Sequence, residues 1–339
     1  MANQRTYAGL DSVSKIGLAQ QFVVASLFVL LLVYGSPAFA GKHAADFKTY
    51  DMTGFEFTPF EHRDKGLEKV PVLYMCAMFR ADFVKGVNNC NDVDLSEPAL
   101  DVIRQRADES IGKTIVAIDI EGGNWNFHSS DLDVVQGAVD RWQVLIDTWK
   151  QVNPDTKILI YGAMPRVWWA IATSNLEKMR LAESQALKIA PLFKNDQVEL
   201  WPSAYVSTDM PDVHREARRW KIDVCHQVYR TKCYFAIDPQ YLREYAADGF
   251  RLHMDRNSFL EVMLTLKEDG ADGFGLWIHP GHLSHDYESR MERWSRNNGA
   301  ASNNYDRNWD IHDRDLMWLN ALTKFLDANN SPKGQYRRK

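Results

Sequence analysis

The stretch IVAIDIEGGNW, from Ile115 to Trp125, contains four apolar residues, an Asp-x-Glu pair and two glycines. A short apolar run of this kind is typical of a buried strand in a parallel sheet. Side chains two positions apart on a strand point to the same face, so Asp119 and Glu121 are predicted to project together, roughly 6.5–7 Å apart along the backbone. Ile120 is predicted to point the opposite way, toward surrounding helices.

Two carboxyl groups on one face at the end of an apolar strand repel each other and lose hydration. Both effects raise the pKa of a carboxyl group, so at least one of the two should stay protonated near neutral pH. A general acid for glycosidic cleavage needs a carboxyl group in that state. The alternative is a strand that ends in solvated acids without a chemical role.

The rest of the chain alternates short apolar runs with helical patterns, which predicts parallel strands joined by crossover helices. The predicted strands are Val70–Met78, Thr114–Ile120, Lys157–Ala163, Val198–Val206, Phe250–Met254 and Gly273–Ile278. The predicted helices are Leu132–Lys150, Leu176–Ile189, Pro239–Ala247, Ser258–Glu268 and about Asp313–Asp327.

This order predicts an α/β fold, a (β/α)8 TIM-type barrel that is irregular or incomplete. Six strands are visible where a complete barrel has eight, so the missing ones are expected within residues 45–60 and 221–238. An open doubly wound sheet is the alternative, and the lack of a glycine-rich phosphate-binding loop disfavours it.

The first 40 of the 339 residues have the pattern of an export signal. An apolar run from Phe22 to Tyr34 is followed by Ala38-Phe39-Ala40, which supplies small residues at a cleavage site. We therefore expect a signal peptide at 1–40, a single catalytic domain at 41–339, and a periplasmic or secreted protein with no membrane association after cleavage. An uncleaved membrane anchor is the alternative.

The net charge and the cysteine count indicate which partners and which covalent bonds to expect. The net charge is −5, whereas nucleic-acid binding favours a basic face, so we expect no nucleic-acid partner. We also expect a monomeric protein. Four cysteines remain in the mature chain, and in an exported protein an even number predicts disulfide bonds. The first choice of pairing is Cys76–Cys90 with Cys225–Cys233, although three pairings are possible.

Three strand ends together resemble a known pattern. They are Ile118-Asp119-Ile120-Glu121, Pro202-Ser203-Ala204-Tyr205 and Gly273-Phe274-Gly275-Leu276-Trp277. In this order and approximate spacing, along about residues 70–280, they resemble the hyaluronidase family of glycoside hydrolases and, more loosely, chitinase-like barrels. The resemblance implies hydrolysis of a polysaccharide by a retaining mechanism in which the 2-acetamido group of the substrate assists.

The same resemblance implies roles for individual residues. Glu121 would be the general acid and base, and Asp119 would orient the acetamido group. Tyr205 would hydrogen-bond near that group, and Trp277 would form the floor of a sugar subsite. The alternative for Tyr205 and Trp277 is packing within the barrel.

Three more aromatic residues, Tyr161, Trp201 and Trp125, are candidates for the sugar cleft because they lie at or near strand ends, although Trp201 could instead fill the top of the barrel. Around Trp125 and Tyr161 the chain departs from the family pattern, which leaves the substrate open. A metal at His279, His282 and His285 is disfavoured because Pro280-Gly281 indicates a loop, so we expect neither metal nor cofactor.

Two other functions stay open. One is a two-carboxylate glycosidase that acts on another exopolysaccharide, with Asp209 or Asp255 as the second acid. The other is a non-catalytic carbohydrate-binding barrel, against which the acid pair argues, because a lectin does not need two repelling carboxyl groups.

Overall fold

The computed structural model describes residues 47–52, 66–80, 93–204, 206, 210–245, 251–277 and 321–329. The expected export signal, Tyr205, Asp209 and the three histidines at 279–285 lie outside these residues. Among the described residues, no group of side chains could hold a metal ion, and no helix has the length and apolarity needed to cross a membrane.

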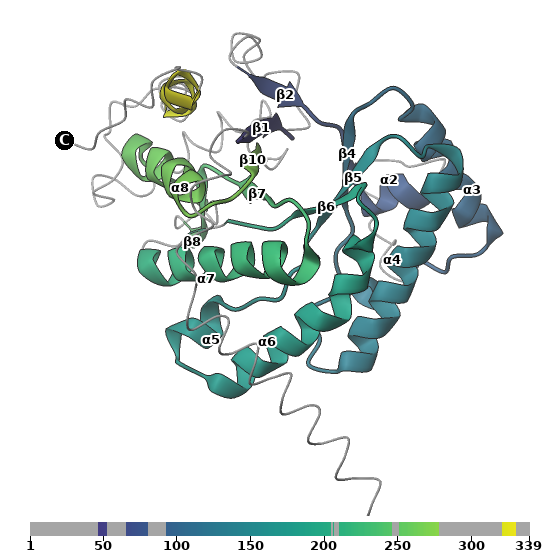
Figure 1. The fold of residues 1–339 in the computed structure, drawn as a ribbon, viewed down its shortest axis with the longest axis horizontal. Coiled ribbons are helices and arrows are strands. Elements are labelled where there is room, and N and C mark those ends of the chain that lie inside the picture. The colour runs from purple at the N-terminus through teal and green to yellow at the C-terminus, as the bar shows by residue number, and fades with distance from the viewer. Residues whose placement is uncertain are drawn as a thin grey trace, which may run out of the picture. The chain divides into compact units, whose positions relative to one another are not determined.

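Parallel strands form the centre of the molecule (Figure 1). One hydrogen-bonded row is β2-β1-β10-β7 and the other is β3-β4-β5-β6. Their bounds are β1 Lys48–Asp51, β2 Leu67–Lys69, β3 Val72–Tyr74, β4 Ile115–Asp119, β5 Lys157–Tyr161, β6 Val198–Trp201, β7 Tyr234–Ile237 and β10 Gly273–Leu276.

The two rows join at both ends. The bridges Leu200↔Cys233 and Ser203↔Ala236 connect β6 with β7. At the other end, β2 and β3 are parts of one stretch, 67–74, whose first half pairs with β1 and whose second half pairs with β4. Counting that stretch as one strand, the pairings among the described residues close a ring of seven parallel strands.

The ring confirms the predicted barrel architecture and two of its details. The strands expected within 45–60 and 221–238 are β1 and β7. Each has only four residues, too few to show a period, and only pairing with β10 makes them recognisable. The prediction for Val70–Met78 was partly wrong, because β3 ends at Tyr74 and a short helix, α2 (Met75–Phe79), follows.

Alternate residues of the strands fill the ring. The buried interior cluster includes Tyr50, Ala117, Leu159, Trp201 and Tyr234. Such layers of inward side chains are the packed core of a barrel rather than a pore. On β10, a β-carbon at Gly273 would lie 2.1 Å from the carbonyl oxygen of Lys48, so only glycine allows β1 to approach this closely.

Helices cover the outer side of the strands (Figure 1). The long ones are α3 (Glu97–Glu109), α4 (Leu132–Val152), α6 (Leu176–Ile189), α7 (Pro211–Asp223) and α8 (Arg256–Glu268). α4 buries the predicted face, which comprises Val135, Val139, Trp142, Ile146 and Trp149. The predicted bounds of α6 are confirmed, and Asn175 caps its first turn by accepting from the backbone N–H of Lys178.

One predicted helix was wrong. Residues 239–247 contain the strand β8 (Gln240–Tyr245), which pairs antiparallel with β9 (Arg251–His253). The apolar residues of this segment fit a helical spacing, but pairing between the two segments decides the conformation. The weak strand predicted at Phe250–Met254 is therefore part of a hairpin and does not belong to the ring.

The cysteines only partly follow the predicted pairing. Cys76 is disulfide-bonded, and Cys90 lies outside the described residues. Cys225 and Cys233 are buried free thiols, so the predicted bond between them is absent from the structure. The Cys225 thiol instead lies 3.6 Å from the carbonyl oxygen of Thr231, to which it donates.

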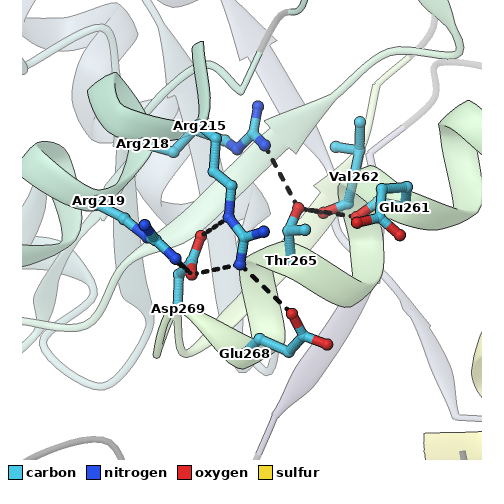
Figure 2. Close-up of polar contacts among 8 residues, drawn as sticks. All are labelled: Arg215, Arg218, Arg219, Glu261, Val262, Thr265, Glu268 and Asp269. Atoms are coloured by element: carbon cyan, nitrogen blue, oxygen red, sulfur yellow. Dashed lines mark hydrogen bonds and ion pairs between the residues drawn. The ribbon is translucent and has the colours of Figure 1, made fainter. Parts of the chain in front are cut away.

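Arginines of α7 bind the C-terminal end of α8 (Figure 2). Arg215 donates to both carboxylate oxygens of Asp269 at 3.0 and 2.9 Å, and Arg219 donates to the same carboxylate at 2.9 Å. Arg218 is buried, and its guanidinium donates to Thr265 at 3.3 Å. The segment reads as charged in sequence, yet its arginines hold the two helices together.

Replacing Asp269 should therefore loosen the contact between α7 and α8. Its side chain is only 4% exposed, so Asp269→Asn should leave Arg215 and Arg219 without their shared anion and cost about 2 kcal/mol in the free energy of unfolding. Glu268→Gln is the matched control. Its side chain is 47% exposed and 3.4 Å from Arg215, so its cost should stay below about 0.5 kcal/mol. Urea denaturation of both variants measures the difference, and equal costs would contradict this reading.

Candidate active site

The two acids lie where β4 leaves the ring. Asp119 is the last residue of β4 and is half-buried, Ile120 is 2% exposed, and Glu121 is solvent-exposed. Because inward and outward positions alternate, Asp119 follows Ile115 and Ala117 on the inner face of the strand, and these two belong to the interior cluster. Asp119 therefore faces the carboxyl-end opening of the ring.

Glu121 lies over the end of the neighbouring strand. Its Oε1 is 4.0 Å from the point where a side chain at Gly162 would begin, directly after β5. Gly162 has a φ of +72°, which favours glycine, so the turn after β5 carries no side chain at this place.

Protein surroundings raise the pKa of both acids. Burial, followed by the charge of Glu121, raises the pKa of Asp119 to about 8. Although the Glu121 side chain is accessible, the surrounding protein removes part of its hydration and so also raises its pKa, while the positive charge of Arg166 partly opposes that rise. The pair therefore keeps at least one proton near neutral pH, as the sequence predicted, and Asp119 has the greater tendency to hold it.

One basic residue that sequence reasoning missed, Arg166, acts on Glu121 and connects it electrostatically to two further basic groups. Arg166 is exposed, follows β5, and acts electrostatically on Glu121, His128 and Lys221. Burial, then Arg166 and Lys221, lowers the pKa of His128 to about 3, so its imidazole is neutral. Burial lowers the pKa of Lys221 to about 8, and its ammonium donates to the carbonyl oxygen of Ser203 at 2.8 Å.

Two aromatic residues, Tyr74 and Trp277, lie at the opening of the ring on the other side of Asp119. Trp277 directly follows β10 and is half-buried. Its indole N–H donates to the hydroxyl oxygen of Tyr74 at 3.1 Å. Tyr74 ends β3 and is the register partner of Asp119 on β4. The side chains of Trp277, which the sequence predicted as a site residue, and Tyr74, which it did not, therefore meet next to Asp119.

The remaining predicted site residues are placed differently. Trp125 is 1% exposed and packs against Phe79 and Trp142, with ring centroids 5.2 and 5.8 Å apart. Trp201 is fully buried inside the ring, where Tyr161 covers it edge to face at 5.0 Å. Neither indole is open to a sugar, which corrects the sequence-based expectation. Tyr161 itself is 8% exposed.

Asp255, considered above as a second acid, has a different use. Its carboxylate caps α8 by accepting from the backbone N–H groups of Asn257 and Ser258 at 2.8 and 3.0 Å. Burial alone would raise its pKa, but the hydrogen bonds from Ser258 and Asn257 outweigh that effect and lower it. A carboxylate engaged in this way is a helix cap rather than a partner of Asp119 and Glu121.

Comparison with solved structures identifies a similar fold. The chain is similar to bee venom hyaluronidase in its monoclinic crystal form, with 16% sequence identity, a TM-score of 0.50, and coverage of 74% of this chain and 97% of that one. Bee venom hyaluronidase in complex with a hyaluronic acid tetramer matches with 15% identity and a TM-score of 0.46, covering 74% and 96%. No family model and no curated protein matches the sequence. The chain therefore has a hyaluronidase-like barrel fold.

Because Asp119 is buried beside another acid, it should make stability depend on pH. Its pKa of about 8 in the folded protein exceeds the ordinary value of 3.8, so the folded state binds the proton more tightly. The free energy of unfolding should then fall as pH rises from about 4 to 8, by at most about 1.4 kcal/mol per pH unit.

Asp119→Asn removes this dependence. The variant should gain stability relative to the wild type as pH rises through this window, measured by denaturation at pH 5 and pH 8. Asp108→Asn, an exposed site on α3, is the control and should differ from the wild type by the same amount at both pH values. A pH-independent difference for Asp119→Asn would show that the carboxyl group is not held in its protonated form.

Proposed function

We propose that this protein hydrolyses glycosidic bonds in a polysaccharide, with Glu121 as general acid and base and Asp119 as its partner. The observation that carries the proposal is the pair itself, two carboxyl groups with raised pKa values at the carboxyl end of a barrel strand. Barrel enzymes carry their catalytic groups at that end of the strands. The hyaluronidase-like fold supports the same reaction class.

Exposure divides the roles between the two acids. Glu121 is exposed and can reach the glycosidic oxygen of a bound sugar, whereas Asp119 is half-buried behind it. In the free protein Asp119 is the better proton holder. A substrate N–H that donates to Asp119 would stabilise its ionised form, and the shared proton would then be on Glu121.

We propose that the reaction is retaining, as the resemblance to the hyaluronidase family implies. Glu121 gives its proton to the leaving oxygen while the acetamido oxygen of the sugar bonds to the anomeric carbon and the glycosidic bond breaks. Ionised Asp119 stabilises the positive charge of the resulting ring. Water then attacks the anomeric carbon, Glu121 takes the proton of that water, and the acetamido oxygen leaves. The substrate proposed here is accordingly a polysaccharide that contains N-acetylhexosamine.

The same proposal includes where the protein acts. The pattern at residues 1–40 supports cleavage after Ala40 and action in the periplasm or outside the cell, and we propose that the protein acts there as a monomer. Sequencing the amino terminus of the exported protein tests this, because a start at Gly41 is expected and an intact leader would indicate a retained anchor.

The decisive experiment is a screen of the purified mature protein on polysaccharides with and without N-acetylhexosamine. Glu121→Gln should lower turnover by roughly 100-fold or more while glycan binding remains. Glu183→Gln is a matched control, because burial also raises the pKa of Glu183, but this residue lies on α6. It should retain wild-type turnover.

The mechanism has its own test. A thiazoline inhibitor, which mimics the ring formed by the acetamido group, should inhibit the enzyme under the proposed mechanism. Cleavage that persists in Glu121→Gln would refute the assignment of the acid. Cleavage that the thiazoline leaves unaffected would refute participation of the acetamido group.

A further inference from the structure

We propose that Tyr74 is a positioning residue of this site, which fixes the ring of Trp277 as the wall against which a sugar stacks beside Asp119. This inference rests on the proposed function and adds a residue to it. Tyr74 belongs to none of the motifs in the sequence, and its place follows from strand register and one hydrogen bond.

Strand alternation directs Tyr74 into the ring. Val70 belongs to the interior cluster and Val72 packs against it, so Tyr74, two positions further along the chain, follows the same inward series. Its register partner on β4 is Asp119, and neighbouring strands lie about 4.8 Å apart. The phenol ring therefore stands beside the Asp119 side chain, and the charge of Asp119 acts on the Tyr74 hydroxyl.

The hydrogen bond to Trp277 has a fixed direction. An indole N–H can only donate, so the Tyr74 oxygen accepts at 3.1 Å and keeps its own proton for another acceptor. The two residues are 203 positions apart and come from β3 and the end of β10, with β1 between these strands in the ring. One bond thus ties together two separate parts of the opening.

Loss of this bond has a specific consequence for Trp277. The residue is half-buried, directly follows its strand, and packs against the interior cluster. Without the Tyr74 oxygen, the indole N–H lacks this anchor and the ring can rotate. A rotated ring no longer presents a flat face to a sugar at a set distance from Asp119, so substrate binding should suffer more than the chemical step.

The first arm of the test needs no substrate. In a 15N spectrum of the tryptophan indole N–H groups, Trp277→Phe identifies the Trp277 signal by its disappearance. Tyr74→Phe should move that signal and speed its exchange with solvent. Tyr50→Phe is the matched control, because Tyr50 is also a barrel tyrosine bonded to an aromatic partner, Tyr234, and it should leave the Trp277 signal in place. An unmoved Trp277 signal in Tyr74→Phe overturns the inference.

The second arm uses cleavage of the polysaccharide found in the screen. Tyr74→Phe should lower kcat/KM by roughly tenfold, mainly by raising KM, and should cause no further loss in a Trp277→Phe background. Additive losses, or a loss equal to that of Tyr50→Phe, would overturn the inference. Absence of cleavage by the wild-type protein would instead sink the proposed function, and the indole spectrum would still report whether Tyr74 holds Trp277.

Discussion

The energetic cost of burying Asp119 beside Glu121 is the constraint on which this site depends. A carboxyl group partly removed from water and placed next to another acid resists ionisation, and its pKa rises to about 8. Burial of the apolar residues Ile115 and Ala117 on the same face of β4 stabilises the fold and offsets this cost. Arg166 limits the effect at Glu121, so the two carboxyl groups differ in their hold on the shared proton.

Much of this arrangement follows from local sequence. The apolar run of β4 and the alternation through Asp119, Ile120 and Glu121 predict the strand and the relation of the acids, since a period of two needs no tertiary information. The helical face of α4 is predictable for the same reason, because a length of 21 residues repeats the 3.6-residue period several times.

The features that sequence reasoning missed depend on contacts between distant segments. β1 and β7 have four residues each, too few to show a period, and their pairing with β10 defines them. Trp125 reads as a cleft residue because it follows a strand, but its ring is buried against α4. Tyr74 gains its place from a register partner and from a hydrogen bond across 203 positions, and neither leaves a local signal.

The stretch 67–74 gives its hydrogen bonds first to β1 and then to β4, with Val70 and Pro71 at the change. The backbone N–H of Val70 bonds to β1 at Asp51, whereas Pro71 has no N–H and offers only its carbonyl oxygen, to Ala117 of β4. This one stretch therefore pairs with both β1 and β4, and the ring has a smaller circumference than it would have with a separate strand for each. A ring this narrow, plugged by Tyr50, Tyr234 and Trp201, has no room for a chain to thread through its centre. Under the proposed function, a polysaccharide would therefore enter and leave across the same rim of the ring, where Asp119 lies.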